Sequence, residues 1–468
     1  MPSLILHLGL GAFHRAHQAV YLHALRQAGD TRWSLSGTNL RPDMADTLAA
    51  LAGQQGRYTL ETISPAQVYR YEWIESIGEV IPYAPGIAAA IARGADPATR
   101  IISFTVTEAG YCLDAAHRLD PMQTEIAEDI ARVQGGLAGV TIYGAMAAIL
   151  RARMASGSGP VTLLNCDNLR HNGERFRQAL VAFLDLVGDA DLRAWTLANT
   201  SCPNAMVDRI TPRAPPALRD RVRQATGRDD AAPITAESFI QWVIEDDFCA
   251  GRPDWERVGV QMVASVEPWE EAKIRILNAS HSAIAWAGTL KGLQFIHEGT
   301  HDPAIRQIAH DYVTEDVMPC LADAVAASGG AIDLAAYRDV VLERFGNPSI
   351  RDTNQRVAMD GFAKLPGFIA PTVRERLAAG ASIRSVAMLP ALFLAFLQRW
   401  HRHALPYVYQ DQAMDVAAAH AICEAPDPVA ALCADRALWD EIAADPRLVD
   451  AVRAATGRVE ALVRGGTP

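Results

Sequence analysis

The segment 268–281 reads Pro-Trp-Glu-Glu-Ala-Lys-Ile-Arg-Ile-Leu-Asn-Ala-Ser-His and carries four polar side chains at spacings that suit chemistry. On an α-helix, which turns by about 100° per residue, all four fall within one arc of about 140°: Glu270, Lys273, Asn278 and His281. Ile274, Ile276, Leu277 and the downstream Ala283, Ile284 and Trp286 are apolar, so we expect the helix to be buried. Buried polar groups need hydrogen-bond partners or a chemical purpose.

Oxidation of an alcohol would use such a set. A hydride leaves the carbon for a nicotinamide while a base removes the hydroxyl proton. Desolvation in a cleft lowers the pKa of a lysine in general, so Lys273 is a candidate for that base. The amide of Asn278 would hold the developing alkoxide without a competing charge. His281 would bond a neighbouring hydroxyl, and Glu270 would pass the proton to solvent. The competing interpretation is an exposed stripe in which Glu270 pairs with Lys273 across one helical turn.

Lysine is scarce in this chain. Among 43 basic residues only three are lysine, at Lys273, Lys291 and Lys364. Arginine keeps its proton near neutral pH, whereas a buried lysine can lose it. The three lysines are therefore candidates for positions where arginine cannot serve, and the alternative is that they remain by chance.

Other oxidoreductase chemistries fit less well. No tyrosine stands four residues before any lysine, which excludes a Tyr-x-x-x-Lys pair. The seven cysteines are scattered, with no C-x-x-C pair and no cysteine–histidine cluster of the kind that holds catalytic zinc. We therefore expect no metal, and buried thiols in a reducing compartment.

The segment 4–17 predicts a strand, a tight glycine turn and a helix. Gly9 would make the turn, and Gly11 would let a pyrophosphate approach the backbone at the start of the helix. The third glycine of the G-x-G-x-x-G fingerprint is replaced by His14. A plain strand-to-helix turn is the alternative. The dinucleotide contacts we expect are Gly9, Leu10, Gly11, Ala12, Phe13 and Arg15.

An acid after the second strand commonly bonds the adenosine ribose of the cofactor. Asp43 is placed for that role, while the neighbouring Arg41 would suit a 2′-phosphate. We expect NAD, and NADP stays open.

The first 265 residues alternate short β-branched runs with amphipathic helical patterns, which indicates an α/β domain with a parallel sheet. Helical patterns then follow one another to the end of the chain. We expect a Rossmann-type dinucleotide-binding domain at 1–265 and a mostly α-helical substrate-binding and catalytic domain at 266–468. The predicted strands are Leu4–Leu8, Trp33–Gly37, Tyr58–Ile63, Val68–Ile74, Ile101–Val106 and Val161–Asn165. The predicted helices are 267–297, 303–328, 333–345, 371–379, 381–403, 413–423 and 437–464.

Composition limits the partners. A net charge of −11 argues against nucleic acid and against an anionic membrane surface. The apolar run 385–398 is too short to span a bilayer and contains Pro390. A strand that starts at residue 3 leaves no room for a signal peptide. We expect a cytoplasmic monomer or weak oligomer that acts on a small molecule.

Several motifs together resemble the long-chain polyol dehydrogenases, a family that includes mannitol 2-dehydrogenase, D-arabinitol 4-dehydrogenase and fructuronate reductase (mannonate oxidoreductase). The resemblance covers nearly the whole chain, and the Lys-x₄-Asn-x₂-His spacing at 273–281 is the signature of this family. The motifs that carry it are His7–Gln18, Thr105–Cys112, Cys166–Gly173, Pro203–Pro212, Gln241–Asp246, Gly251–Glu256 and Asn347–Pro366.

The resemblance implies a role for each matching residue. Lys273 would be the general base, and Asn278 and Asn168 would form the oxyanion pocket. His281 would contact the substrate. Asp208 would line the site, and Glu270 and Glu108 would lie on the route by which the proton leaves. Arg356 and Lys364 would reach the sugar chain. The resemblance gives Lys291 no role, so we interpret it as a surface charge.

The resemblance implies a polyol dehydrogenase acting on a pair of the mannitol/fructose, arabinitol/xylulose or sorbitol type. Met44 stands where strongly NAD-selective mannitol dehydrogenases have a second acid, which leaves cofactor selectivity open. A fructuronate reductase is the alternative within the family, and it needs a further cation for the substrate's carboxylate. A non-catalytic sugar or nucleotide sensor is the alternative outside it, and it has no need for a deprotonatable lysine.

Overall fold

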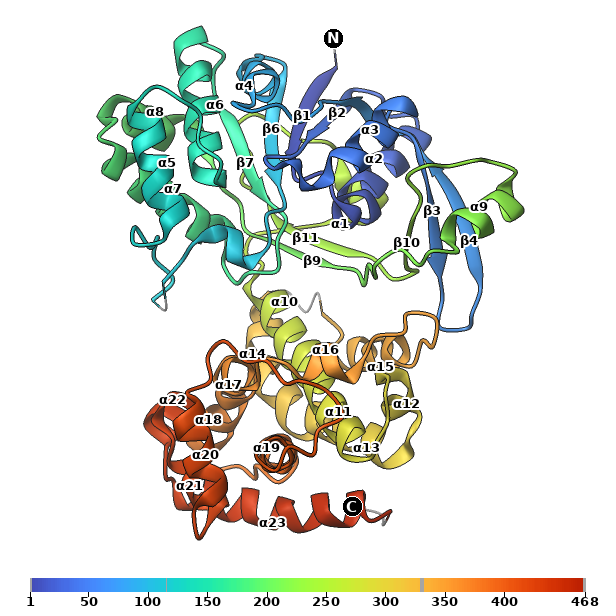
Figure 1. Ribbon diagram of the computed structural model, residues 1–468, viewed down its shortest axis with the longest axis vertical. Coiled ribbons are helices and arrows are strands. Elements are labelled where there is room, and N and C mark those ends of the chain that lie inside the picture. Colours follow the sequence, from blue (N-terminus) through green and yellow to red (C-terminus); the bar gives the residue numbers. More distant parts are fainter. Residues whose placement is uncertain (1, 115, 329–331, 466–468) are drawn as a thin grey trace. The chain divides into compact units, whose positions relative to one another are not determined.

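The computed structural model describes residues 2–114, 116–328 and 332–465 (Figure 1). It divides into two compact units. The first comprises the chain up to Ile63 together with Val68–Glu267. The second comprises the chain from Pro268 onward together with Ser64–Gln67.

A six-stranded parallel sheet forms the centre of the first unit, in the order β5-β2-β1-β6-β7-β8. The strand order reverses between β1 and β6, which makes the carboxyl ends of these two strands the topological switch point of the sheet. This arrangement confirms the predicted Rossmann-type fold. The strands are β1 (Ser3–Leu8), β2 (Trp33–Thr38), β5 (Ile77–Val80), β6 (Thr99–Phe104), β7 (Val161–Asn165) and β8 (Thr200–Ser201).

Two three-stranded sheets complete the first unit. One has the order β10-β3-β4 and the other β12-β11-β9. The sequence predicted β3 (Tyr58–Ile63) and β4 (Tyr69–Ile74) but not the other four, because strands of three to five residues leave little periodic signal. The missed strands of these two sheets are β9 (Ala205–Asp208), β10 (Ile234–Glu237), β11 (Gln241–Glu245) and β12 (Gln261–Val263). The short strands β5 and β8 of the large sheet were missed as well.

Helices flank the large sheet. In Figure 1 α5, α7 and α8 gather beside the β6–β7–β8 end, and α2 and α3 lie beside β1 and β2. Apolar side chains of these helices and of the strands form the core. The helices are α1 (Ala12–Ala16), α2 (Gln18–Gln27), α3 (Ala45–Gly53), α4 (Ala88–Ala95), α5 (Thr124–Gln134), α6 (Ile142–Ser156), α7 (Asn172–Val187), α8 (Ala190–Asn199) and α9 (Leu218–Thr226).

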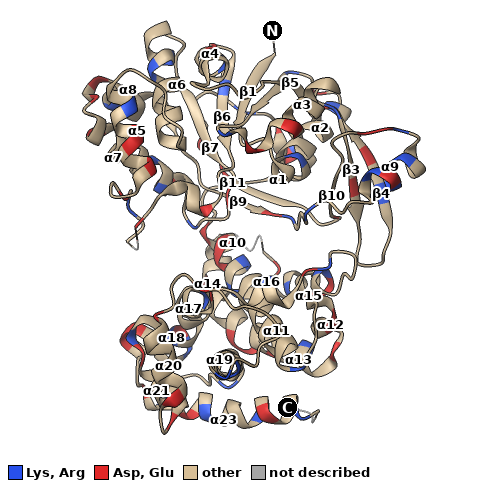
Figure 2. Cartoon of the chain, viewed as in Figure 1, with Lys and Arg blue, Asp and Glu red and all other residues tan. Residues whose placement is uncertain are grey.

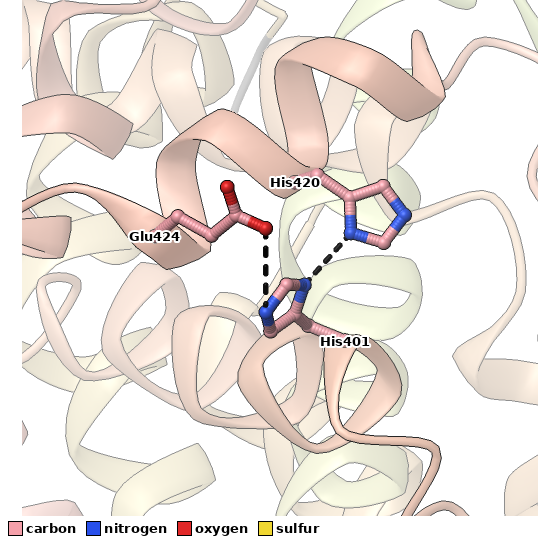
Figure 3. A group of neighbouring side chains, drawn as sticks. All are labelled: His401, His420 and Glu424. Carbon is pink, nitrogen blue, oxygen red and sulfur yellow. Dashed lines mark hydrogen bonds and ion pairs between the residues drawn. The ribbon is translucent and has the colours of Figure 1, made fainter.

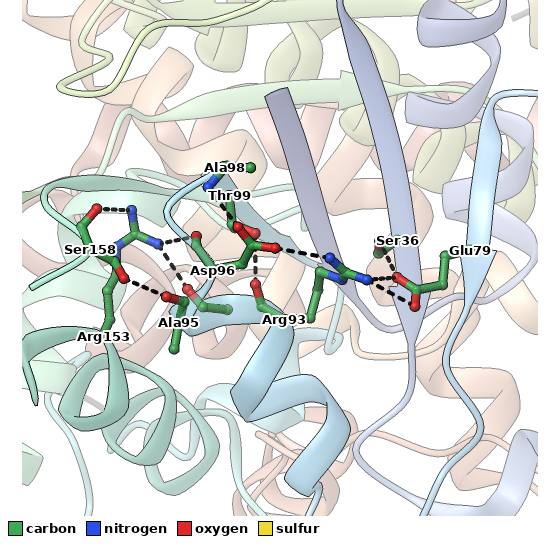
Figure 4. Close-up of polar contacts among 10 residues, drawn as sticks. Ser36, Glu79, Arg93, Ala95, Asp96, Ala98, Thr99, Arg153 and Ser158 are labelled. Carbon is green, nitrogen blue, oxygen red and sulfur yellow. Dashed lines mark hydrogen bonds and ion pairs between the residues drawn. The ribbon is translucent and has the colours of Figure 1, made fainter. Parts of the chain in front are cut away.

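A buried arginine ties α6 to the turns beside it (Figure 4). The guanidinium of Arg153 donates to backbone carbonyls of Gly94, Asp96 and Ser158, among others, at 2.9–3.1 Å. Each N–H is satisfied without a counter-ion, so the group acts as a structural cross-link. Arg93 continues the network by pairing with Asp96 and Glu79.

The second unit is helical, as predicted, although several helices are shorter than the sequence suggested. The helix expected at 381–403 begins at Met388, and the one expected at 437–464 is interrupted by residues with positive φ at Asp440 and Ala444. The helices are α10 (Glu267–Ala272), α11 (Ala279–Leu290), α12 (Ile296–His301), α13 (Pro303–Asp311), α14 (Met318–Ala327), α15 (Leu334–Phe345), α16 (Asn354–Ala358), α17 (Gly361–Lys364), α18 (Ala370–Ala378), α19 (Met388–His401), α20 (Val416–Glu424), α21 (Pro428–Ala434), α22 (Arg436–Trp439) and α23 (Pro446–Val463).

Three π-helical turns interrupt the helices of this unit, at Lys273–Asn278, Tyr312–Val317 and Leu365–Ile369. The first packs against the other two. π turns inside helices are rare and often accompany functional sites. The helix predicted at 267–297 is therefore α10, a π turn and α11, and it ends at Leu290, before Gly292 with its φ of +76°.

Charged residues of both signs mix on the exposed helices α9 and α23 (Figure 2). On α9, Arg223 pairs with Asp220 and Arg219 with Asp229, which lies just beyond the helix. Local pairing therefore offsets much of the positive charge there. Across the described part of the chain, no helix is long and apolar enough to cross a membrane.

Candidate active site

The glycine turn after β1 is built around Gly9. Its φ is +107°, and a Cβ at this position would lie 2.2 Å from the carbonyl oxygen of Thr105. Only glycine fits such a close approach between two strand ends. A Cβ on Gly11 would have no neighbour nearer than 3.8 Å, so the backbone there is open to a ligand.

The residues after the turn are fixed mainly by contacts inside the domain. The Leu10 N–H donates to Asn39 Oδ1 at 2.6 Å, which joins the turn to the end of β2. Arg15 is buried, and its guanidinium donates to Ala232 O at 2.7 Å. That contact belongs to the fold, and a contact of Arg15 with a cofactor remains a prediction.

His14, at the position of the missing third glycine, is buried and stacks on His7 with ring centroids 3.5 Å apart. His7 in turn bonds Ser103 on β6 at 2.9 Å. Burial lowers the pKa of both imidazoles, so both rings are neutral near pH 7. In the usual fingerprint the third glycine lets the helix pack closely on the strand because it has no side chain. Here the stacked rings of His7 and His14 form that contact between β1 and α1.

Asp43 lies beyond the end of β2, in a short 3₁₀ turn, and is exposed. Arg41 beside it makes a 3.4 Å contact with Glu125. An acid and a base thus lie side by side just after β2, and this geometry is compatible with NAD and with NADP.

Asn168 and Glu108 lie on neighbouring loops at the carboxyl ends of β7 and β6. The buried carboxylate of Asp167 joins these loops, because it accepts the N–H groups of Val106 at 2.9 Å and Thr107 at 3.0 Å. Asn168 itself is exposed. The first unit thus gathers the glycine turn, Asn168 and Glu108 along the carboxyl edge of one sheet, where ligands of open α/β sheets bind.

Asp208 is the last residue of β9 and is buried. It pairs with Gln241 in the antiparallel register of β11. The strand that positions it was not predicted from the sequence.

In the second unit, Lys273 and Asn278 are the first and last residues of the π turn between α10 and α11. A π turn bonds residue i to residue i+5, so these two residues lie closer to one face than the α-helical projection allowed. On an α-helix Lys273 and Asn278 stand at the two ends of the predicted arc of about 140°, and the π turn brings them closer together than that. Lys273 and Glu270 are buried, at 9% and 6% exposure. That burial argues against the exposed charged stripe.

Every residue of α11 is buried except His281. Its ring stacks on Phe345 at 4.3 Å, and its Nε2 lies 3.3 Å from Oδ2 of Asp352. Burial lowers the pKa of His281 despite the nearby carboxylate, so the imidazole is neutral at pH 7. With Nε2–H directed at Asp352, Nδ1 is left as an acceptor.

Asp352 also accepts from Arg356 Nε at 2.6 Å. Burial would raise the pKa of Asp352, yet the hydrogen bonds from His281 and Arg356 hold it well below its usual range. Backbone bonds fix this segment: Ile296 N–H donates to Asp352 O, and Asn354 N–H to Gln294 O, both at 2.9 Å. Asp352 was not predicted from the sequence, although its place four residues before Arg356 was a visible signal.

Lys364 ends α17 and donates from Nζ to Val357 O at 2.7 Å. Burial lowers the pKa of Lys364 to about 8. Lys364 also interacts electrostatically with His281, Asp352 and Arg356, so the second unit brings these four residues into one cluster. Lys291 lies apart from it, ion-paired with Asp302 at the start of α13.

The cysteines match the prediction in part. All seven are free, but Cys249 is exposed and Cys202, Cys320 and Cys423 are only half-buried. Exposure at Cys249 corrects the expectation that all the thiols are buried.

A Rossmann-type sheet with a glycine turn at its switch point, followed by a helical unit with a buried polar cluster, is typical of two-domain dehydrogenases. The chain belongs to the mannitol dehydrogenase family: the mannitol dehydrogenase Rossmann domain matches residues 3–257, and the mannitol dehydrogenase C-terminal domain matches residues 265–460.

Two relatives and one solved structure resemble the chain over nearly its full length. It is 58% identical to the D-arabinitol 4-dehydrogenase of Ralstonia nicotianae, over 98% of this chain and 97% of that protein. It is 52% identical to the D-arabinitol 4-dehydrogenase of Klebsiella pneumoniae, over 98% of each. The ternary complex of Pseudomonas fluorescens mannitol 2-dehydrogenase with NAD and D-mannitol matches with a TM-score of 0.80 at 34% identity, covering 99% of this chain and 94% of that one.

Proposed function

We propose that this protein is an NAD-dependent polyol dehydrogenase that interconverts a sugar alcohol and its ketose, with D-arabinitol and D-xylulose as the leading pair. The observation that carries the proposal is the π turn that presents a buried lysine and an asparagine five residues apart, next to a histidine oriented by Asp352. The similarity to two D-arabinitol 4-dehydrogenases supports the choice of pair.

The names of the relatives agree on the position of oxidation. C4 of a five-carbon polyol is C2 when counted from the other end, so a 4-dehydrogenase and a 2-dehydrogenase both oxidise the carbon next to a terminal one. A single arrangement of base and hydride acceptor can therefore serve pentitols and hexitols. Chain length would then be distinguished at the far end of the substrate, where we place Arg356 and Lys364.

The residues fit a dinucleotide. Gly11 leaves the backbone open beside the strand ends, and Asp43 is exposed beyond β2. Gly9 to Phe13 would hold the pyrophosphate, with NAD favoured and NADP left as the alternative. When bound, the nicotinamide supplies the hydride acceptor.

Lys273 removes the hydroxyl proton in oxidation and returns it in reduction. Asn278 and Asn168 donate to the alkoxide oxygen as charge develops on it. Nδ1 of His281 accepts a hydrogen bond from a neighbouring hydroxyl, and Asp208 lines the site. Glu270 and Glu108 carry the released proton toward solvent.

The test is a panel of five- and six-carbon polyols, with NAD and NADP, together with fructose and fructuronate as substrates for reduction. We expect the highest kcat/KM for a polyol with NAD, and D-arabinitol to lead the panel. Preferred reduction of fructuronate would favour the fructuronate reductase alternative. No turnover of any member, with NADH bound, would favour a sensor.

A further inference from the structure

A group of three potential metal ligands lies on the surface of the second unit, on helices that carry none of the proposed active-site residues (Figure 3). His401 is the last residue of α19, and His420 and Glu424 stand in the last turns of α20. One ligand atom of each lies within 4.8 Å of the other two. Among the described residues, this is the one place where three such groups gather.

The ring of His401 lies between the two side chains of α20. Its Nδ1 is 2.7 Å from Nδ1 of His420, and its Nε2 is 3.8 Å from the carboxylate of Glu424. At 2.7 Å one ring donates its Nδ1–H to Nδ1 of the other, and the contact with Glu424 is too long for a hydrogen bond. A cation in place of that proton would bind Nδ1 of both rings. The carboxylate of Glu424 faces Nε2 of His401 and would turn toward the ion, since ligand atoms of all three residues lie within 4.8 Å of one another.

The surroundings favour a cation. The carboxyl ends of α19 and α20 both meet here, and the negative ends of two helix dipoles stabilise positive charge. Trp400 stacks on His420 with centroids 4.8 Å apart, which holds that ring in orientation. His420 and Glu424 stand four residues apart and so face the same side of α20. Arg402, the next residue after His401, is exposed, so water and salt screen its charge.

The donor set selects the kind of ion. Two imidazoles and one carboxylate suit Zn²⁺ and similar divalent transition metals, and they suit Mg²⁺ and Ca²⁺ poorly. Ligand atoms of a tetrahedral zinc ion lie about 3.3 Å apart, which modest side-chain rotations at this surface can reach. We propose that His401, His420 and Glu424 form a structural site for a divalent transition metal, with water as the fourth ligand, that clamps α19 to α20.

Zinc binding to the full-length chain without a polyhistidine tag tests this. The protein is stripped with a chelator, and equilibrium dialysis against Zn²⁺ or Mg²⁺ is read by metal analysis alongside the thermal melting temperature. We expect one Zn²⁺ per chain and a rise in melting temperature with Zn²⁺ but not with Mg²⁺. In His420→Gln we expect this site to weaken by about tenfold or more and the thermal shift to be lost.

Two further variants keep the test decisive. Glu424→Gln changes an exposed side chain, so it should fold normally and still weaken zinc binding. His403→Asn removes an exposed histidine outside the cluster, at a position with a φ of +54° that asparagine tolerates, and should bind zinc like the wild type. Equal zinc binding by the wild type, His420→Gln and Glu424→Gln, or no binding by the wild type at about 10 µM zinc, would overturn the proposal.

Discussion

Nε2 of His281 lies 3.3 Å from Oδ2 of Asp352, and the same carboxylate accepts from Arg356. The carboxylate thus fixes the tautomer of His281 and the position of Arg356. Both residues are proposed to contact the substrate. Asp352 is a positioning residue in this account, because it acts through its two partners.

Replacing Asp352 by Asn should lower kcat/KM for the polyol by about ten- to a hundredfold, which is roughly 1.4–2.7 kcal/mol of transition-state stabilisation. The asparagine amide cannot accept from both His281 and Arg356 as the carboxylate does, so we expect most of the loss to appear as a higher KM for the polyol. Steady-state kinetics with NAD at saturation measure how the loss divides between kcat and KM. Asp339→Asn, an exposed acid paired with Arg338, is the matched control and should change nothing. A lower melting temperature with unchanged kinetics would make Asp352 purely structural.

Lys364 should leave a signature in the pH dependence of stability. Its pKa in the folded chain is lowered to about 8, so between about pH 8 and 10.4 the unfolded chain holds the extra proton and stability rises with pH. Lys364→Met lacks that rise. The variant's unfolding free energy relative to the wild type should therefore fall by about 1–3 kcal/mol between pH 7 and pH 10.

Urea denaturation at both pH values measures this difference. Arg402→Met is the control, because arginine does not titrate in this range. A difference between Lys364→Met and the wild type that stays constant with pH would contradict the lowered pKa.

Gly9 and Gly11 should respond differently to alanine. Gly9→Ala places a Cβ 2.2 Å from Thr105 O at a φ of +107°, so the free energy of unfolding should drop by roughly 2–5 kcal/mol. Gly11→Ala has room in the folded chain and should keep its melting temperature while NADH binding weakens. Calorimetry and NADH fluorescence titration check both. Unchanged NADH affinity in Gly11→Ala would remove the turn from the cofactor site.

Polyol turnover should survive exhaustive treatment with chelators. In the proposed mechanism Lys273 does the work that a zinc-bound alkoxide would otherwise require. The one three-ligand group among the described residues lies on α19 and α20. Initial rates before and after dialysis against EDTA measure this. Activity lost with EDTA and restored by added metal would contradict the proposed chemistry.

The sequence predicted most of what depends on local patterns. Strand β7 appears at Val161–Asn165 as expected, because a continuous apolar run between turns has few other interpretations. Gly9 was recognised from the glycine pattern that follows the first strand, and its φ of +107° is a conformation that favours glycine. Features set by long-range packing were missed. The π turn at Lys273–Asn278 packs against two other π turns distant in sequence, and a wheel drawn for an α-helix cannot show it. Asp352 acquires its importance only when α16 packs on α11 and brings it to His281.

The central claim is that Lys273 is the base. Replacing it with arginine keeps the positive charge but removes any ability to give up a proton. The most direct test is the rate of polyol oxidation by Lys273→Arg beside Lys273→Ala, with melting temperature and NADH binding checked for both. We expect the two variants to be nearly equally inactive while they remain folded and bind NADH. Retention by Lys273→Arg of more than about a tenth of wild-type oxidation, a loss below ~1.4 kcal/mol, would contradict the claim and move the base to Glu270 or Glu108.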